Sequence, residues 1–317
     1  FIPFGDLNYN LLPTLPLDRH RRQNMDEAIE FPVLPELSAI DFSSTSDVRA
    51  LCKERLHHLF DGQGDGYIDE YMDAIEELFA GRCSEYLAMD TDYHDITHTL
   101  QATLCLVELI HHRHFSDAAP RLDADDFKRA FVAVLFHDIG YLKTADDTQG
   151  SGAKYTHLHE QRSCEFTRNF LEQRGWASDD IRFVEHLIGS TGPNADFTRI
   201  GFGSEIERML GQAVCTADYI GQMSDPNYPD RLEILFNEFA ESYRYQQIPH
   251  DEWPFADFEA LLRSTPDFWN LFVQPKLNTE CAGLWAHLEH PVSGENPYME
   301  AVEQNLATIR GRIEGLD

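Results

Sequence analysis

The sequence predicts an all-α fold, a helical bundle with an extended N-terminal arm and a helical C-terminal tail. Three observations support this prediction. No stretch alternates apolar and polar residues with the period of two that a half-buried strand requires. Apolar residues instead recur every three or four positions, which is the spacing of a helix with one buried face. Residues that start or stop helices flank several of these stretches.

The first 48 residues differ from the rest of the chain. They have no sustained apolar period, and prolines interrupt them at five positions, Pro3, Pro13, Pro16, Pro32 and Pro35. We therefore expect residues 1–48 to form an extended arm that wraps the body. Residues 49–250 are expected to form the main helical domain, and residues 251–317 to add helices that pack on that domain.

Apolar spacing predicts the first helices at residues 47–60 and 68–79, and a glycine ends the second one. A third helix begins near His94 and continues through Ile110. It ends in the run His111–His114, which we expect to lie in solvent, because cationic side chains are favoured at the C-terminal end of a helix dipole.

The next helix is capped by Asp123 or Asp125 and ends just before Gly140. Ser204 and Glu207 have the spacing of a capping box and mark a later helix start. The remaining apolar stripes predict helices near 159–170, 178–188, 204–218, 229–239, 258–262, 268–272 and 299–313. The last stripe spans only about two heptads, so we expect it to dock on its own chain, with a homodimer as the alternative.

The charge balance limits the possible partners. Asp and Glu number 55 against 25 Lys and Arg, which gives a formal net charge of −30. Such a chain repels polynucleotides and anionic membranes, so we expect neither a nucleic acid polymer nor a membrane as partner. No apolar run approaches the ~20 residues that span a bilayer. The six cysteines form no Cys-x-x-Cys pair, which is typical of reduced thiols in a cytoplasmic protein.

Three short segments carry side chains suited to a metal ion. His94 and His98 are four residues apart and therefore share one face of a helix. His137 and Asp138 stand side by side at the end of an apolar helix. Asp218 interrupts another apolar helix, where a carboxylate is costly to bury unless a cation or several donors hold it. One divalent ion bound by His98, His137, Asp138 and Asp218 explains all three segments.

The order of these residues on helices resembles the HD superfamily of metal-dependent phosphohydrolases. Within it, Tyr93-His94-Asp95 followed by His98-Thr99 is similar to the signature of the cyclic nucleotide phosphodiesterases, which usually have Asn where this chain has Asp95. The segment from Thr216 to Pro226 also resembles the Ala-Asp-Leu-Ser segment of that family. The resemblance covers roughly residues 90–240 and does not identify the substrate.

The resemblance implies hydrolysis of a phosphoester with one or two divalent ions, which we expect to be Mn, Fe, Zn or Mg. Asp138 is expected to act in catalysis by bridging to a second ion, and His94 to protonate the leaving oxygen, oriented by Asp95 or a backbone carbonyl. His159 matches a position that reaches the metal region in many HD proteins, so it is a candidate ligand of the second ion or a structural residue. His186 is a weaker candidate for the same role.

Lys143 precedes a polar, glycine-rich loop and is a candidate contact for a substrate phosphate, with a solvated surface lysine as the alternative. The predicted substrate is a small, nucleotide-like phosphodiester or phosphomonoester. Two other functions remain open. An HD-type diiron oxygenase would use the same scaffold with His159 and a further histidine at the second iron. A non-catalytic ligand-binding or interaction module would bind its ligand without turnover.

Overall fold

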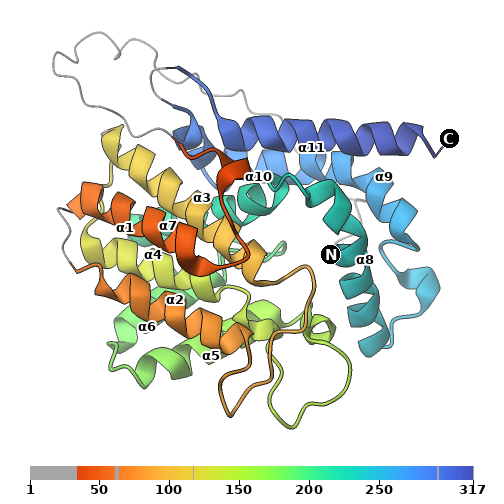
Figure 1. The fold of residues 1–317 in the computed structure, drawn as a ribbon, viewed down its shortest axis with the longest axis horizontal. Helices are drawn as coiled ribbons and strands as arrows, with labels where there is room; N and C mark the ends of the chain where they lie inside the picture. The colour runs from red at the N-terminus through yellow and green to blue at the C-terminus, as the bar shows by residue number, and fades with distance from the viewer. Residues whose placement is uncertain (1–33, 61–63, 117, 291–292, 317) are drawn as a thin grey trace.

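The computed structural model describes residues 34–60, 64–116, 118–290 and 293–316 (Figure 1). Within these ranges the chain is all-α, as predicted, and its only β-pairing is an isolated bridge between Tyr86 and Thr144. The α-helices are α1 Thr45–Phe60, α2 Gly66–Phe79, α3 Ile96–Phe115, α4 Ala124–Phe136, α5 His159–Glu172, α6 Ser178–Ile188, α7 Glu205–Met223, α8 Tyr228–Tyr245, α9 Phe258–Phe268, α10 Gln274–Thr279 and α11 Pro297–Glu314.

Helix α3 is the central element of the bundle. Every residue from His98 to Arg113 is buried, because α1, α4 and α7 pack around this helix. Asp95 caps its first turn by accepting a hydrogen bond from the backbone N–H of His98 at 3.0 Å. A helix covered on all sides can place polar side chains in the interior only where other groups satisfy them.

The C-terminal end of α3 is buried, so the prediction that His111–His114 lies in solvent was wrong. His111, His112 and Arg113 are 0, 5 and 3% exposed. The short 3-10 helix η7 (Leu284–Leu288) lies against this end of α3. The helix dipole favours cationic side chains in solvent at this end of α3, but packing against η7, far along the chain, buries them.

The C-terminal helices contact the helices that carry the candidate site. Helix α11 lies along one edge of the molecule (Figure 1) and packs on α7, α8 and α9. Asn305 donates hydrogen bonds to the backbone carbonyls of Met223 and Asp225 at 2.9 and 2.7 Å. The apolar stripe of α11 thus docks on its own chain.

The segments 258–262 and 268–272 were predicted as two separate short helices. In the structure α9 continues through a π-helical turn, Trp269–Val273, into α10, so they form one helical path.

The predicted extended arm lies for the most part outside the described residues, because the description begins at Leu34. Its last part contains the 3-10 turn Leu37–Ala39, and α1 begins at Thr45, so the end of the predicted arm is helical. The predicted boundary after residue 250 falls within the 3-10 turn His250–Glu252.

Among the described residues, none of the helices has the length and the apolar content that a membrane span requires.

Backbone contact between α7 and α3 depends on Gly221. A Cβ atom at this position would lie 2.9 Å from both the backbone N and the Cα of Ala102, closer than real Cβ atoms approach such groups. Only glycine allows the two helices to meet in this way. Gly221 follows Asp218 by three residues, so this close approach sets where the Asp218 carboxylate lies relative to α3.

We expect Gly221→Ala to lower the free energy of unfolding by about 1–3 kcal/mol, because the added methyl group overpacks a backbone contact. Gly311→Ala is the matched control, since Gly311 also lies in a helix but a Cβ there would meet no atom within 4 Å. The control should raise stability by up to about 1 kcal/mol through helix propensity. Urea unfolding with EDTA present measures both variants. Equal effects of the two substitutions would show that the α3–α7 approach does not require glycine.

Candidate metal centre

The first candidate ligand, His98, lies in the first turn of α3 and points into the interior. Its ring is 3% exposed, and its Nδ1 atom is buried without a hydrogen-bond partner. The second, His137, ends α4 as its C-cap and is 1% exposed. The Nδ1 atom of His137 donates to the carbonyl of Val134 at 2.7 Å, which leaves the Nε2 lone pair free to bind a cation. The C-terminal end of the α4 dipole also favours positive charge there.

Four donor atoms from three helix regions meet at this point. The Nε2 atoms of His98 and His137 are 3.2 Å apart. Oδ2 of Asp138 lies 3.1 and 3.3 Å from these two nitrogens, and Oδ1 of Asp218 lies 3.4 and 3.6 Å from them. The structure therefore brings together all four residues that the sequence suggested as ligands of one ion.

The donor set fits a divalent metal ion. Ligand atoms about 2.0–2.2 Å from a common ion lie roughly 3–3.5 Å from one another, which is close to the spacing observed. Oδ2 of Asp138 is buried and has no hydrogen-bond partner, although His98 Nε2 is near. Two imidazoles and two carboxylates suit Mn, Fe, Zn or Mg, and their two negative charges are otherwise costly to bury.

His159 lies on the other side of Asp138 and reaches its second oxygen. The Nε2 atom of His159 is 3.4 Å from Oδ1 of Asp138, and its Nδ1 donates to the carbonyl of Thr156 at 2.6 Å. Gly140 permits this approach, because a Cβ atom there would lie 2.1 Å from the carbonyl oxygen of His159. Asp138 thus offers one oxygen to the four-residue cluster and the other to His159.

His94 is held by a carboxylate that the sequence did not suggest. Its Nδ1 donates to Oε2 of Glu238 at 2.5 Å, and Glu238 Oε1 accepts the backbone N–H of Tyr93 at 2.6 Å. Glu238 comes from α8 and is only 5% exposed. Asp95, expected to orient His94, instead caps α3 and pairs with Arg231 at 3.2 Å. The expectation for Asp95 was wrong because the helix start already uses its carboxylate.

Gln222 is a second residue that the sequence did not suggest. Its Nε2 donates to Oδ1 of Asp218 at 3.3 Å, and its Oε1 accepts the hydroxyl of Tyr93 at 3.0 Å. Gln222 follows Asp218 by one helical turn, a spacing that places the two side chains together. This contact orients the Asp218 carboxylate from outside the ligand set.

Sequence comparison places the chain in a family. Residues 48–284, most of the chain, match the Npun_R2479-like family. The chain belongs to the Npun_R2479-like family. That name states no reaction, and no curated protein sequence matches the chain.

Solved structures share the fold of this Npun_R2479-like protein. The phosphodiesterase domain of the RhoPDE fusion protein from the choanoflagellate Salpingoeca rosetta has a TM-score of 0.57 and 14% identity, over 86% of this chain and 93% of that one. Another structure, the phosphodiesterase domain of the rhodopsin phosphodiesterase of Salpingoeca rosetta, has a TM-score of 0.53 and 14% identity, over 87% and 91%. At this identity the likeness shows a common fold.

Lys143 and His186, the other candidate site residues of the Npun_R2479-like chain, pair with groups outside the metal centre. The buried ammonium group of Lys143 lies 2.6 Å from Oδ2 of Asp90 and donates to the carbonyl of Gly150 at 2.6 Å. These contacts give Lys143 a role in holding its loop. The alternative of a solvated surface lysine was wrong, because the residue is 5% exposed, and a substrate contact stays a prediction. Nδ1 of His186 lies 2.7 Å from Oε1 of Glu207, so this histidine pairs with the start of α7.

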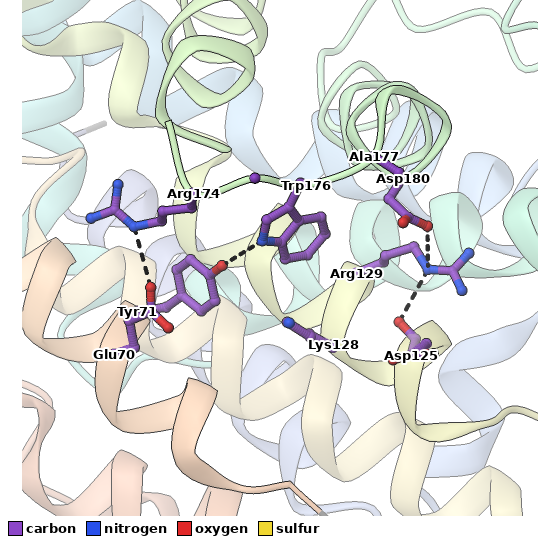
Figure 2. A pocket seen from close by; sticks show the side chains of 10 residues that line it. Glu70, Tyr71, Asp125, Lys128, Arg129, Arg174, Trp176, Ala177 and Asp180 are labelled. Atoms are coloured by element: carbon purple, nitrogen blue, oxygen red, sulfur yellow. Dashed lines mark hydrogen bonds and ion pairs between the residues drawn. The ribbon is translucent and has the colours of Figure 1, made fainter. Parts of the chain in front are cut away.

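A hollow of about 360 Å³ lies between α2, α4 and the turn that joins α5 to α6 (Figure 2). None of the candidate metal ligands lines it. Across the hollow, Arg174 Nε lies 3.3 Å from Glu70, and Trp176 Nε1 donates to the hydroxyl of Tyr71 at 2.8 Å. These contacts tie the α5–α6 turn to α2, so we interpret the hollow as part of the packing between these elements.

The electrostatics of the metal centre favour protonated imidazoles beside ionised carboxylates. Burial acts to lower the pKa of His98, but contacts with Asp138 and Asp218 outweigh burial and raise it to about 9. Burial acts to raise the pKa of Asp218, but His137 and His98 lower it to about 2. Protons on the imidazoles therefore compete with any cation for the same lone pairs.

We expect the affinity for Mn²⁺ to rise between pH 6.5 and 8.5, by about tenfold per pH unit for each proton released. The sign follows from the raised pKa of His98, which keeps its ring protonated below about pH 9. Calorimetric titration in two buffers with different ionisation enthalpies measures affinity and proton release together. His186→Ala, which removes a histidine outside the centre, should behave like the parent. An affinity independent of pH would contradict this electrostatic description.

Proposed function

We propose that this protein is a metal-dependent phosphodiesterase of the HD type that hydrolyses a small, nucleotide-like phosphodiester. The observation that carries the proposal is the pairing of a four-residue metal site with the His94–Glu238 dyad beside it. The ring centroids of His94 and His98 are 5.6 Å apart, so the candidate metal site and the His94–Glu238 dyad are neighbours. The fold shared with phosphodiesterase domains supports the same reaction class.

The residues of the metal centre would hold the ion that the reaction requires. A divalent ion would supply a Lewis acid for a phosphoryl oxygen and make hydroxide available near neutral pH. His98, His137, Asp138 and Asp218 would bind it, with Asp138 shared toward a second ion near His159. His159 lies beside Oδ1 of Asp138, and this position supports a second ion in addition to the first.

Three side chains of the site keep part of their surface exposed. The side chains of His94, His159 and Asp218 keep 14, 13 and 12% of their surface exposed, whereas those of His98 and His137 keep 3 and 1%. A phosphoryl group would therefore enter past the first three residues. Because the chain carries a net charge of −30, the bound ion must supply the local attraction for an anionic substrate. This charge also opposes a polynucleotide substrate.

His94 is suited to act as the general acid. Its Nδ1 proton is donated to Glu238, so the proton that leaves in the reaction is carried by Nε2. A carboxylate at Nδ1 fixes the tautomer and the orientation of the ring. The ring also stacks on Tyr141, with centroids 4.5 Å apart. These contacts hold one orientation of a side chain that must deliver a proton to a leaving alkoxide.

We expect His94→Ala to bind metal like the parent but to lose about 10²–10⁴-fold in kcat toward an unactivated phosphodiester, because the leaving alkoxide lacks its proton donor. Toward bis(4-nitrophenyl) phosphate, whose leaving group departs without protonation, the loss should be much smaller. Glu238→Gln should show the same dependence on the leaving group with a smaller loss.

Metal content and turnover of both substrates are measured on the same preparations of these variants. Equal losses on the two substrates would remove His94 from the acid role. Loss of metal from His94→Ala would make His94 a ligand instead. If the parent with its metal intact turns over no phosphodiester or phosphomonoester in a nucleotide panel, the proposed reaction is wrong.

A further inference from the structure

The far end of α3 holds a second cluster of side chains that can ligate a metal. Glu108, His111 and His112 are all buried, and one donor atom from each lies within 4.8 Å of the others. Residues three and four positions apart share a helix face, so this spacing places both imidazoles next to the carboxylate. His111 follows His98 by thirteen positions, which puts the cluster about 20 Å along the helix axis from the metal centre.

His111 shows that this cluster is not satisfied by its protein contacts. The residue is fully buried, and neither of its ring nitrogens has a hydrogen-bond partner. A buried polar group without a partner costs about 1–3 kcal/mol. Burial, and next the charge of Arg55, lower the pKa of His111. The ring is therefore neutral at pH 7, and neutral imidazole is the form that binds a metal ion.

Glu108 supplies the carboxyl group of the cluster. Its Oε1 and Oε2 accept the Nε–H of Arg55 at 2.9 and 3.2 Å, and His112 Nε2 lies 3.9 Å from Oε2. A carboxylate offers about four lone-pair positions, so the pair with Arg55 leaves positions for an ion. Arg55 then orients the carboxylate, as outer hydrogen-bond donors commonly do for carboxylates that bind metals.

We propose that Glu108, His111 and His112 form a second metal site, which binds a divalent ion such as Zn²⁺ and stabilises the fold rather than taking part in the reaction. Two imidazoles and a carboxylate match the ligands that this ion prefers. His58 of α1 is exposed, and its ring centroid lies 5.6 Å from that of His111. His58 is therefore the nearest candidate for a fourth ligand at the exposed side of the cluster, and its coordination would tie α1 to α3. The inference does not depend on the proposed reaction.

The test uses the full chain with the metal centre disabled by Asp138→Ala and Asp218→Ala together. This variant is loaded with Co²⁺, whose visible absorption reports four-coordinate sites, and is then dialysed and analysed for bound metal. One equivalent should remain. Adding His111→Phe, which keeps a buried ring of similar volume, should remove it. His114→Phe is the matched control, because the ring of His114 contacts Phe60 and Phe115 and is not part of the cluster.

Thermal unfolding gives a second readout on the same proteins. Zn²⁺ should raise the Tm of the disabled variant by about 5 °C and leave that of the His111→Phe form unchanged. In EDTA, the His111→Phe form should be at least as stable as its parent, since it lacks a buried unsatisfied ring. A disabled variant that holds no Co²⁺ overturns the proposal. So does a His111→Phe form that holds as much as its parent.

Discussion

Two buried carboxylates facing two buried imidazoles impose the main constraint on this structure. Asp138 and Asp218 each lie within 3.6 Å of the Nε2 atoms of both His98 and His137. Charges this deep are stable only when a cation or protons compensate them. The fold meets this constraint by joining the start of α3, the end of α4 and the middle of α7, and Gly221 allows the last of these helices to come close enough.

The residues around this centre come from separate elements of the fold, which would divide the work of the proposed phosphodiesterase. Helix α5 brings His159 to the free oxygen of Asp138, and α8 brings Glu238 to His94. The metal side and the proton-donating side of the site thus depend on different helices. This arrangement explains why α8, which supplies no candidate metal ligand, belongs to the site.

Local spacing was enough to predict the all-α fold and the four residues that meet at the centre. The rest depended on contacts that spacing does not encode. Glu238 lies 144 residues from His94, and nothing in its own helix distinguishes it from a surface glutamate. His111 and His112 were expected in solvent, but η7, more than 170 positions further along the chain, covers this end of α3. The pairing of Lys143 with Asp90, 53 positions earlier in the chain, was likewise not encoded in the local pattern.

The most direct test of the central claim is removal and return of the metal in the unmodified protein. Chelator-treated protein should lose its turnover of bis(4-nitrophenyl) phosphate. Activity should then return in proportion to the first one or two equivalents of Mn²⁺, Fe²⁺ or Zn²⁺ bound, because in the proposed reaction His98, His137, Asp138 and Asp218 would hold the ion that is required. Full activity in protein shown by elemental analysis to contain no metal would contradict the account.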